Sequence, residues 1–309
     1  MRIPGWLTAV ACLVTAPGLW AQAAALQKAV ALAPATIYMS PDTSSAKVGV
    51  ARPGMDVGIQ STSGDFIQVF TGVSGWMPNH DVVRLDDPQG DEVLFGAAVG
   101  LENLAEESGG ERQAALDAAR LYMALYSGFP ASPRAAEAAY RGAEIRWEVA
   151  LGEQPKRRTP DERQFPDQTE LRRVESKFGT TPWGARAAYQ LLITHFTCGD
   201  WVEKPQCVGK EIGTYKDYVK KYPTGPMTAE ADYDAVYREA IAWTIYRAPG
   251  KNHDEGKAGG YAKDVAQDAA AMASKYRATD WAAQAALLAF SVAHNTPIAW
   301  PGTTPLGGP

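Results

Sequence analysis

Hydrophobic positions recur with two different periods along this chain. Between residues 35 and 85, short runs such as Phe66 to Val69 alternate with turns rich in Gly and Pro. Period-two runs that are separated by frequent turns predict a small antiparallel β-barrel. From residue 91 onward the period is about 3.6 residues, which predicts amphipathic helices. The expected fold is therefore multidomain, with a small all-β barrel over 33–86 followed by an all-α array over 91–294.

The helical part contains one motif four times. Each copy begins with an aromatic residue and a short turn, and these aromatic residues are Phe129, Phe178, Tyr222 and Tyr276. Alanine follows at the seventh position (Ala136, Ala185, Ala229, Ala283) and at the ninth (Ala138, Ala187, Ala231, Ala285). The eleventh position holds Tyr140, Tyr189, Tyr233 and Leu287. Recurrence of this kind is typical of helix-pair arrays, and small residues allow two helices to approach closely.

Both ends of the chain differ from the rest. Arg2 precedes an apolar stretch from Leu7 to Leu19, and Ala21, Gln22 and Ala23 form a small-x-small cleavage pattern. These features predict a secretory signal peptide over 1–23 and a periplasmic or secreted mature protein. Cleavage after Ala25 fits nearly as well. The Pro- and Gly-rich residues 295–309 are expected to form a disordered tail.

Charge and hydropathy narrow the classes of partner. The sequence has 30 basic and 35 acidic residues. Removal of the signal peptide takes away Arg2, which is one of the 30 basic residues. A mildly acidic chain lacks the basic footprint that nucleic-acid binding requires. Outside the signal, no segment approaches the roughly 18 apolar residues of a membrane-spanning helix. We therefore expect neither a nucleic-acid-binding protein nor an integral membrane protein.

The β-rich segment resembles the bacterial SH3 domain. The resemblance rests on Tyr-Met-Ser-Pro at 38–41, Arg-Pro-Gly at 52–54, Gly-Asp-Phe-Ile-Gln-Val at 64–69 and Gly-Trp-Met at 75–77. The fourth strand departs from the family pattern, because it carries Phe66 where a Trp-containing sequence is usual. The resemblance implies a domain that attaches an exported protein to cell-wall peptides or to another protein. Tyr38 and Trp76 are the candidate residues of its aromatic groove; alternatively Trp76 and Phe66 fill the barrel core.

The four-copy motif resembles tetratricopeptide-type repeats, in particular those of outer-membrane assembly lipoproteins and of the Tol-Pal-associated periplasmic coordinator. The copies at 129–140 and 222–233 carry the resemblance best. Each begins with an aromatic residue followed by Pro, has a second Pro three residues later, and ends with the regularly spaced Ala and Tyr. The resemblance implies an architecture that binds protein partners, without naming them.

Cys198 and Cys207 flank a short, turn-rich segment, which in an oxidising compartment predicts a disulfide. A metal site is not expected, because His195 would be a third ligand beside the two cysteines and the fourth ligand of a tetrahedral zinc site is missing. No motif indicates a cofactor, and the nucleophile-elbow and zinc-protease motifs are absent. A papain-like hydrolase would need Cys198 as nucleophile with His253 or His294 downstream.

The leading hypothesis is an exported, non-catalytic scaffold of the cell envelope. Its barrel would bind peptidoglycan peptide or an envelope protein, and its helical array would hold a protein partner. The competing hypothesis is a cell-wall hydrolase or hydrolase accessory centred on Cys198. The sequence does not determine the oligomeric state.

Overall fold

The computed structural model describes residues 26–107, 111–153, 166–192 and 201–299. The N-terminal part is a seven-stranded antiparallel sheet with the strand order β3-β2-β6-β5-β4-β1-β7. Its strands are β1 (Gln27–Ala31), β2 (Ala35–Tyr38), β3 (Lys47–Ala51), β4 (Asp56–Ser63), β5 (Phe66–Phe70), β6 (Ser74–Pro78) and β7 (Val82–Arg84), with the 3-10 turn η1 (Asn79–Asp81) before the last. The predicted all-β unit is present, and it begins at Gln27 rather than at residue 33. Edge strands β3 and β7 do not pair in the described part of the chain, so hydrogen bonds do not close the sheet into a barrel.

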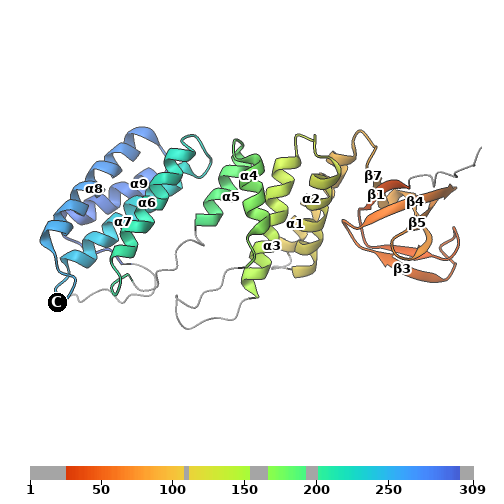
Figure 1. Cartoon of the computed structure of the whole chain (residues 1–309), viewed down its shortest axis with the longest axis horizontal. Helices are drawn as coiled ribbons and strands as arrows, with labels where there is room; N and C mark the ends of the chain where they lie inside the picture. The colour runs from red at the N-terminus through yellow and green to blue at the C-terminus, as the bar shows by residue number, and fades with distance from the viewer. Residues whose placement is uncertain (1–25, 108–110, 154–165, 193–200, 300–309) are drawn as a thin grey trace, which may run out of the picture.

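The sheet nevertheless curls around a single core (Figure 1). Side chains from all seven strands meet there, with Ile37, Ile67 and Met77 almost completely buried. Val82 from edge strand β7 and Ala51 from the opposite edge strand β3 belong to this same cluster. A flat sheet would keep its two edges apart, so curling is what gives so short a segment an interior.

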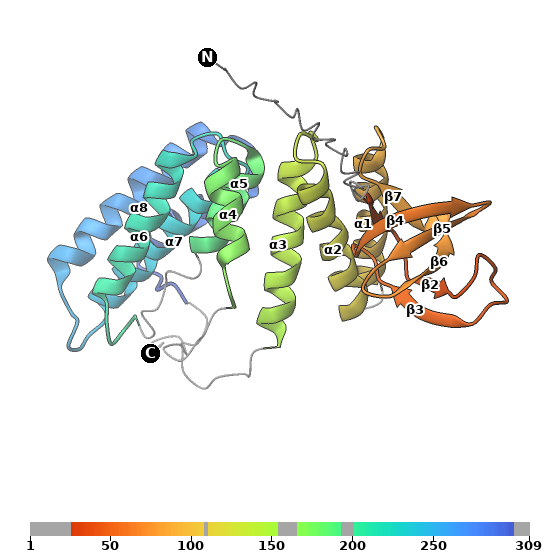
Figure 2. The same cartoon turned by 45° about the vertical axis from the view of Figure 1, so that its right-hand side comes forward.

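The rest of the described chain is helical, with α1 (Gly90–Glu107), α2 (Arg112–Gly128), α3 (Ala135–Gly152), α4 (Thr169–Phe178), α5 (Pro182–Leu192), α6 (Gln206–Lys221), α7 (Thr228–Arg247), α8 (Glu255–Lys275) and α9 (Asp280–Ala293). The four repeated motifs coincide with the turns of four helix pairs, α2/α3, α4/α5, α6/α7 and α8/α9. Helix α1 precedes the first pair and packs against α2 and β7. The pairs follow one another away from the sheet, as Figures 1 and 2 show.

The repeated aromatic residue ends the first helix of each pair. Phe129, Tyr222 and Tyr276 share nearly the same backbone conformation (φ −126°, −124° and −116°; ψ 63°, 63° and 47°) and each donates its backbone N–H to a carbonyl of the preceding helical turn. Phe178 instead is the last residue of α4, which Gly179 caps. The aromatic residue therefore marks the point at which the chain leaves one helix and turns into the next.

The ninth-position alanines lie inside the array, as predicted. Ala138, Ala187, Ala231 and Ala285 are all fully buried. The seventh position is not uniform, because Ala185 is buried, Ala136 and Ala229 are half-buried and Ala283 is exposed. Of the two alanine positions, only the ninth is therefore buried in all four copies.

Two segments rich in Gly or Pro are ordered in part. The segment 249–260 is helical from Glu255, because the Asp254 side chain caps α8 by accepting a hydrogen bond from the backbone N–H of Lys257 (3.0 Å). In the predicted disordered tail, Ile298 donates its N–H to Thr244 Oγ1 (3.0 Å) and lies half-buried against α7. Residues 1–23 and 300–309 lie outside the described ranges.

The sheet and the helices share a second hydrophobic cluster. Val30 of β1 and Val83 of β7 pack with Leu94 of α1 and Leu121 of α2, and all four are buried. Gly90 at the start of α1 permits this junction, since a Cβ there would lie 2.9 Å from Val83 Cγ1 and 2.5 Å from a ring atom of Phe129. The two units are consequently held together by a packed interface and not by a bare linker.

Candidate functional site

The two aromatic residues singled out in the sequence lie next to each other on the sheet. Tyr38 of β2 and Trp76 of β6 are direct cross-strand partners, so their side chains project from the same face. The ring of Phe66 in β5 meets that of Tyr38 edge-on, with ring centres 6.3 Å apart. Pro78 is the cross-strand partner of Phe66. We call these four half-buried residues the aromatic face.

The aromatic face lies on the outside of the curled sheet. In β5, Ile67 and Val69 point into the core, and Phe66 therefore points away from it. In β6, Met77 fills the core while Trp76 remains half-exposed. The interpretation in which Trp76 and Phe66 fill the core is therefore wrong, because aliphatic side chains and Met77 already occupy that space.

Glycine allows the strands that carry this face to approach closely. A Cβ at Gly75 would lie 2.5 Å from Ile37 Cγ2 and 2.7 Å from the carbonyl oxygen of Tyr38. Lys47 continues the row beside Tyr38, and Gln68 continues it beside Trp76. The surface thus offers flat apolar rings bordered by a cation and an amide, a composition that suits an extended peptide.

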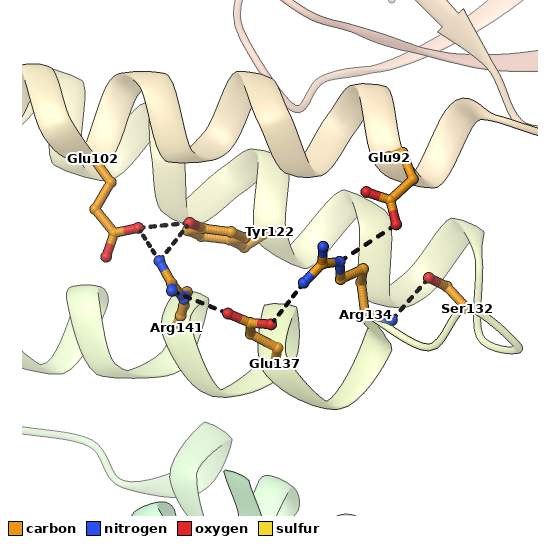
Figure 3. Close-up of polar contacts among 7 residues, drawn as sticks. All are labelled: Glu92, Glu102, Tyr122, Ser132, Arg134, Glu137 and Arg141. Carbon is orange, nitrogen blue, oxygen red and sulfur yellow. Dashed lines mark hydrogen bonds and ion pairs between the residues drawn. The ribbon is translucent and has the colours of Figure 1, made fainter.

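A polar network joins the first three helices (Figure 3). Tyr122 of α2 donates its hydroxyl hydrogen to Glu102 Oε2 of α1 (2.5 Å), and Arg141 Nη1 of α3 donates to the same carboxylate oxygen (2.9 Å). Arg141 also pairs with Glu137 (3.0 Å), which Arg134 approaches within 3.4 Å. These contacts fasten α1 to α3 across α2.

The electrostatics of this network indicate a structural role. Burial raises the pKa of Tyr122, and the neighbouring Glu102 carboxylate raises it further, so the phenol stays protonated as a donor. Burial opposes the charge on Arg141, but Tyr122 and Glu102 raise its pKa overall. The guanidinium of Arg134 also lies 4.5 Å above the ring of Phe95. Donors and acceptors of this network satisfy one another.

The eleventh-position tyrosines link successive pairs along the face formed by α3, α5, α7 and α9. Tyr140 packs on Trp183 of α5 (ring centres 5.7 Å apart), and Tyr233 packs on Trp281 of α9 (5.3 Å). Tyr189 takes the equivalent position and donates a hydrogen bond to Asp234 of α7 (2.8 Å). The sequence interpretation missed these tryptophans, although Trp183 and Trp281 each stand five residues after the repeated aromatic residue.

The same helices carry carboxylates, of which Glu144 and Glu230 are half-buried and Glu148 is exposed. Burial raises the pKa of Glu144 on α3, and burial together with nearby Glu102 raises that of Glu148. On α7, burial raises the pKa of Glu230. Arg186 of α5 interacts electrostatically with both Glu144 and Glu230. The face therefore combines three carboxyl groups with the guanidinium of Arg186, a composition that suits a partner with hydrogen-bond donors.

The predicted disulfide and the candidate nucleophile depend on Cys198, which lies outside the described residues. Cys207 is buried at the start of α6. His253 lies in the loop before α8, and His294 stacks on Phe290 at the end of α9. In the described ranges, no group of three or more His, Cys, Asp or Glu side chains is arranged to hold a metal ion. The disulfide therefore stays a prediction.

None of the described helices combines the length and the apolar character needed to cross a bilayer. Comparison of the sequence with protein-family models and with curated proteins gives no significant match.

Proposed function

We propose that this protein is an exported, non-catalytic scaffold of the bacterial cell envelope. In this proposal the sheet is an SH3-like domain that binds a peptide of the cell wall or an envelope protein. The tetratricopeptide-like helical array holds a second protein. Export rests on the predicted signal peptide over 1–23.

The observation that carries the proposal is the aromatic face. Tyr38, Phe66 and Trp76 are half-exposed side by side, although the core of the sheet is filled without them. Exposing large rings to water gives up the free energy that their burial would provide, about 25 cal/mol per Å² of apolar surface. Rings that remain grouped on a surface are typical of a binding site.

The helical array supports the second part of the proposal. Buried alanines set the approach of each pair, and Tyr140 and Tyr233 join one pair to the next. Such an array presents a long continuous face. Because Glu144, Glu148 and Glu230 lie on that face, we expect its partner to contribute hydrogen-bond donors.

The proposed binding of the sheet to the cell wall is tested by co-sedimentation of the mature chain with purified peptidoglycan sacculi. Trp76→Ala should weaken binding about tenfold or more, since truncating one buried aromatic anchor costs at least about 1.4 kcal/mol. Phe70→Ala is the matched control, because Phe70 is an exposed aromatic residue on the same strand as Phe66 and lies outside the aromatic face. Equal losses in both variants would contradict the proposed face.

The proposed binding of protein partners is tested by site-specific cross-linking. A photoreactive amino acid at Gln68, next to Trp76, should capture the ligand of the sheet in the envelope. A second one at Gln190, which is half-buried on α5, should capture the partner of the helical array. If neither position yields a reproducible cross-link and the sacculi do not bind, the scaffold proposal fails.

A further inference from the structure

The last helix of the array exposes an apolar face. Leu287 and Phe290 of α9 are 67% and 60% exposed, and Ala283 and Ala286 on the same face are exposed as well. These positions follow the three- and four-residue spacing of one helix side. The opposite side is buried against α7 and α8 through Ala282, Ala285 and Val292.

An end helix of a repeat array normally turns a polar face to solvent. Helix α9 carries one charged residue, Asp280, in its first turn and none along the exposed side. Figure 1 shows the α8/α9 pair at the end of the molecule remote from the sheet. The segment after α9 turns toward α7, where Ile298 bonds to Thr244, and no described segment covers Leu287 or Phe290.

The side-chain sizes on this face are complementary to those of the same face on a reversed copy of the helix, because small residues lie in its first half and large ones in its second. The midpoint of α9 lies between Ala286 and Leu287. About a twofold axis at that point, Ala283 stands opposite Phe290 of a second copy, and Ala286 stands opposite Leu287 of that copy. Each contact thus places a small side chain against a large one.

We infer that the protein forms a twofold-symmetric homodimer in which α9 packs antiparallel against α9 of a second copy. Closed twofold interfaces require a self-complementary surface, which two small residues followed by two large ones provide when the second helix runs in the opposite direction. The chain has a formal net charge of −5, yet this face brings no like charges together. Alanine-mediated approach of helices is also how this chain packs its own pairs.

The size of the face sets the expected affinity. A helix of 14 residues is roughly 21 Å long, so a single-helix contact buries less than the about 800 Å² per partner of a standard interface. We therefore expect a reversible dimer with a dissociation constant on the order of 10–100 µM.

Sedimentation equilibrium of the full mature chain, from low micromolar to several hundred micromolar concentration, tests the inference. Wild type should follow a monomer–dimer equilibrium, and Leu287→Glu or Phe290→Glu should each raise the dissociation constant more than tenfold. Leu104→Glu replaces a leucine on α1 that is 45% exposed. It is the control and should leave the dissociation constant of the dimer unchanged. A strictly monomeric wild type, or an equal effect of the control, would overturn the inference.

The orientation is tested separately with spin labels at high protein concentration. In an antiparallel pair, labels on Ala286→Cys lie near the axis, whereas labels on Ala293→Cys are roughly 18 Å farther apart along the helix axis. Equal label separations at the two positions would contradict the antiparallel arrangement. Both alanines are exposed, so neither substitution disturbs the packed side of α9.

Discussion

Glu239 couples the stability of the array to pH. Its side chain is 1% exposed in the middle of α7, where Oε1 accepts a hydrogen bond from Lys216 Nζ of α6 (2.6 Å). The same ammonium contacts Asp268 of α8 (2.8 Å), and Glu239 Oε2 has no hydrogen-bond partner. Burial raises the pKa of Glu239 to about 7, despite the opposing effect of Lys216.

The direction of the effect follows from proton linkage. In the unfolded chain the Glu239 carboxyl has its ordinary pKa of 4.5, so between pH 4.5 and about 7 the folded protein binds the extra proton. The contribution of Glu239 to the unfolding free energy is therefore complete below pH 4.5, the pKa in the unfolded chain. It is lost as the pH rises through about 7, the pKa in the folded protein. The difference in pKa corresponds to about 3 kcal/mol of unfolding free energy.

Substitution by glutamine removes this dependence because the amide does not titrate. We expect the unfolding free energy of wild type, minus that of Glu239→Gln, to fall by about 3 kcal/mol between pH 4.5 and pH 8. Urea titrations followed by helical circular dichroism measure both values at each pH. Glu255→Gln controls for removal of a charge, because that side chain is 72% exposed. A difference that stays constant, or that increases with pH, would refute the assigned role of Glu239.

Two further predictions concern packing. Ala231→Leu should destabilise the protein by about 1–3 kcal/mol through overpacking, whereas Ala271→Leu at an exposed site on α8 should change stability by less than about 0.5 kcal/mol in chemical denaturation. Gly184→Ala should cost about 1–3 kcal/mol, because its Cβ would lie 2.1 Å from the carbonyl oxygen of Phe178. Gly213→Ala, which meets open space in α6, should instead stabilise by up to about 1 kcal/mol, and similar melting temperatures for the two glycine variants would contradict this interpretation.

Strand β1 shows why part of the sheet escaped prediction. Gln27–Ala31 begins four residues after the end of the predicted signal peptide and has little alternation of its own. Its place in the sheet comes from pairing with β4 and β7, which are distant in sequence. Such long-range partners leave no local trace in a strand of five residues.

The sequence by itself determined the repeated helix–turn–helix units and the burial of their ninth-position alanines. Helical periodicity and the turn after each aromatic residue depend on neighbours within a few positions, so both can be predicted from the sequence. Only the tertiary structure decided which side of the sheet Phe66 and Trp76 occupy, how deeply Glu239 is buried and which face of α9 stays open. Alternation divides residues into two sets, but the packing of distant segments determines which set meets water.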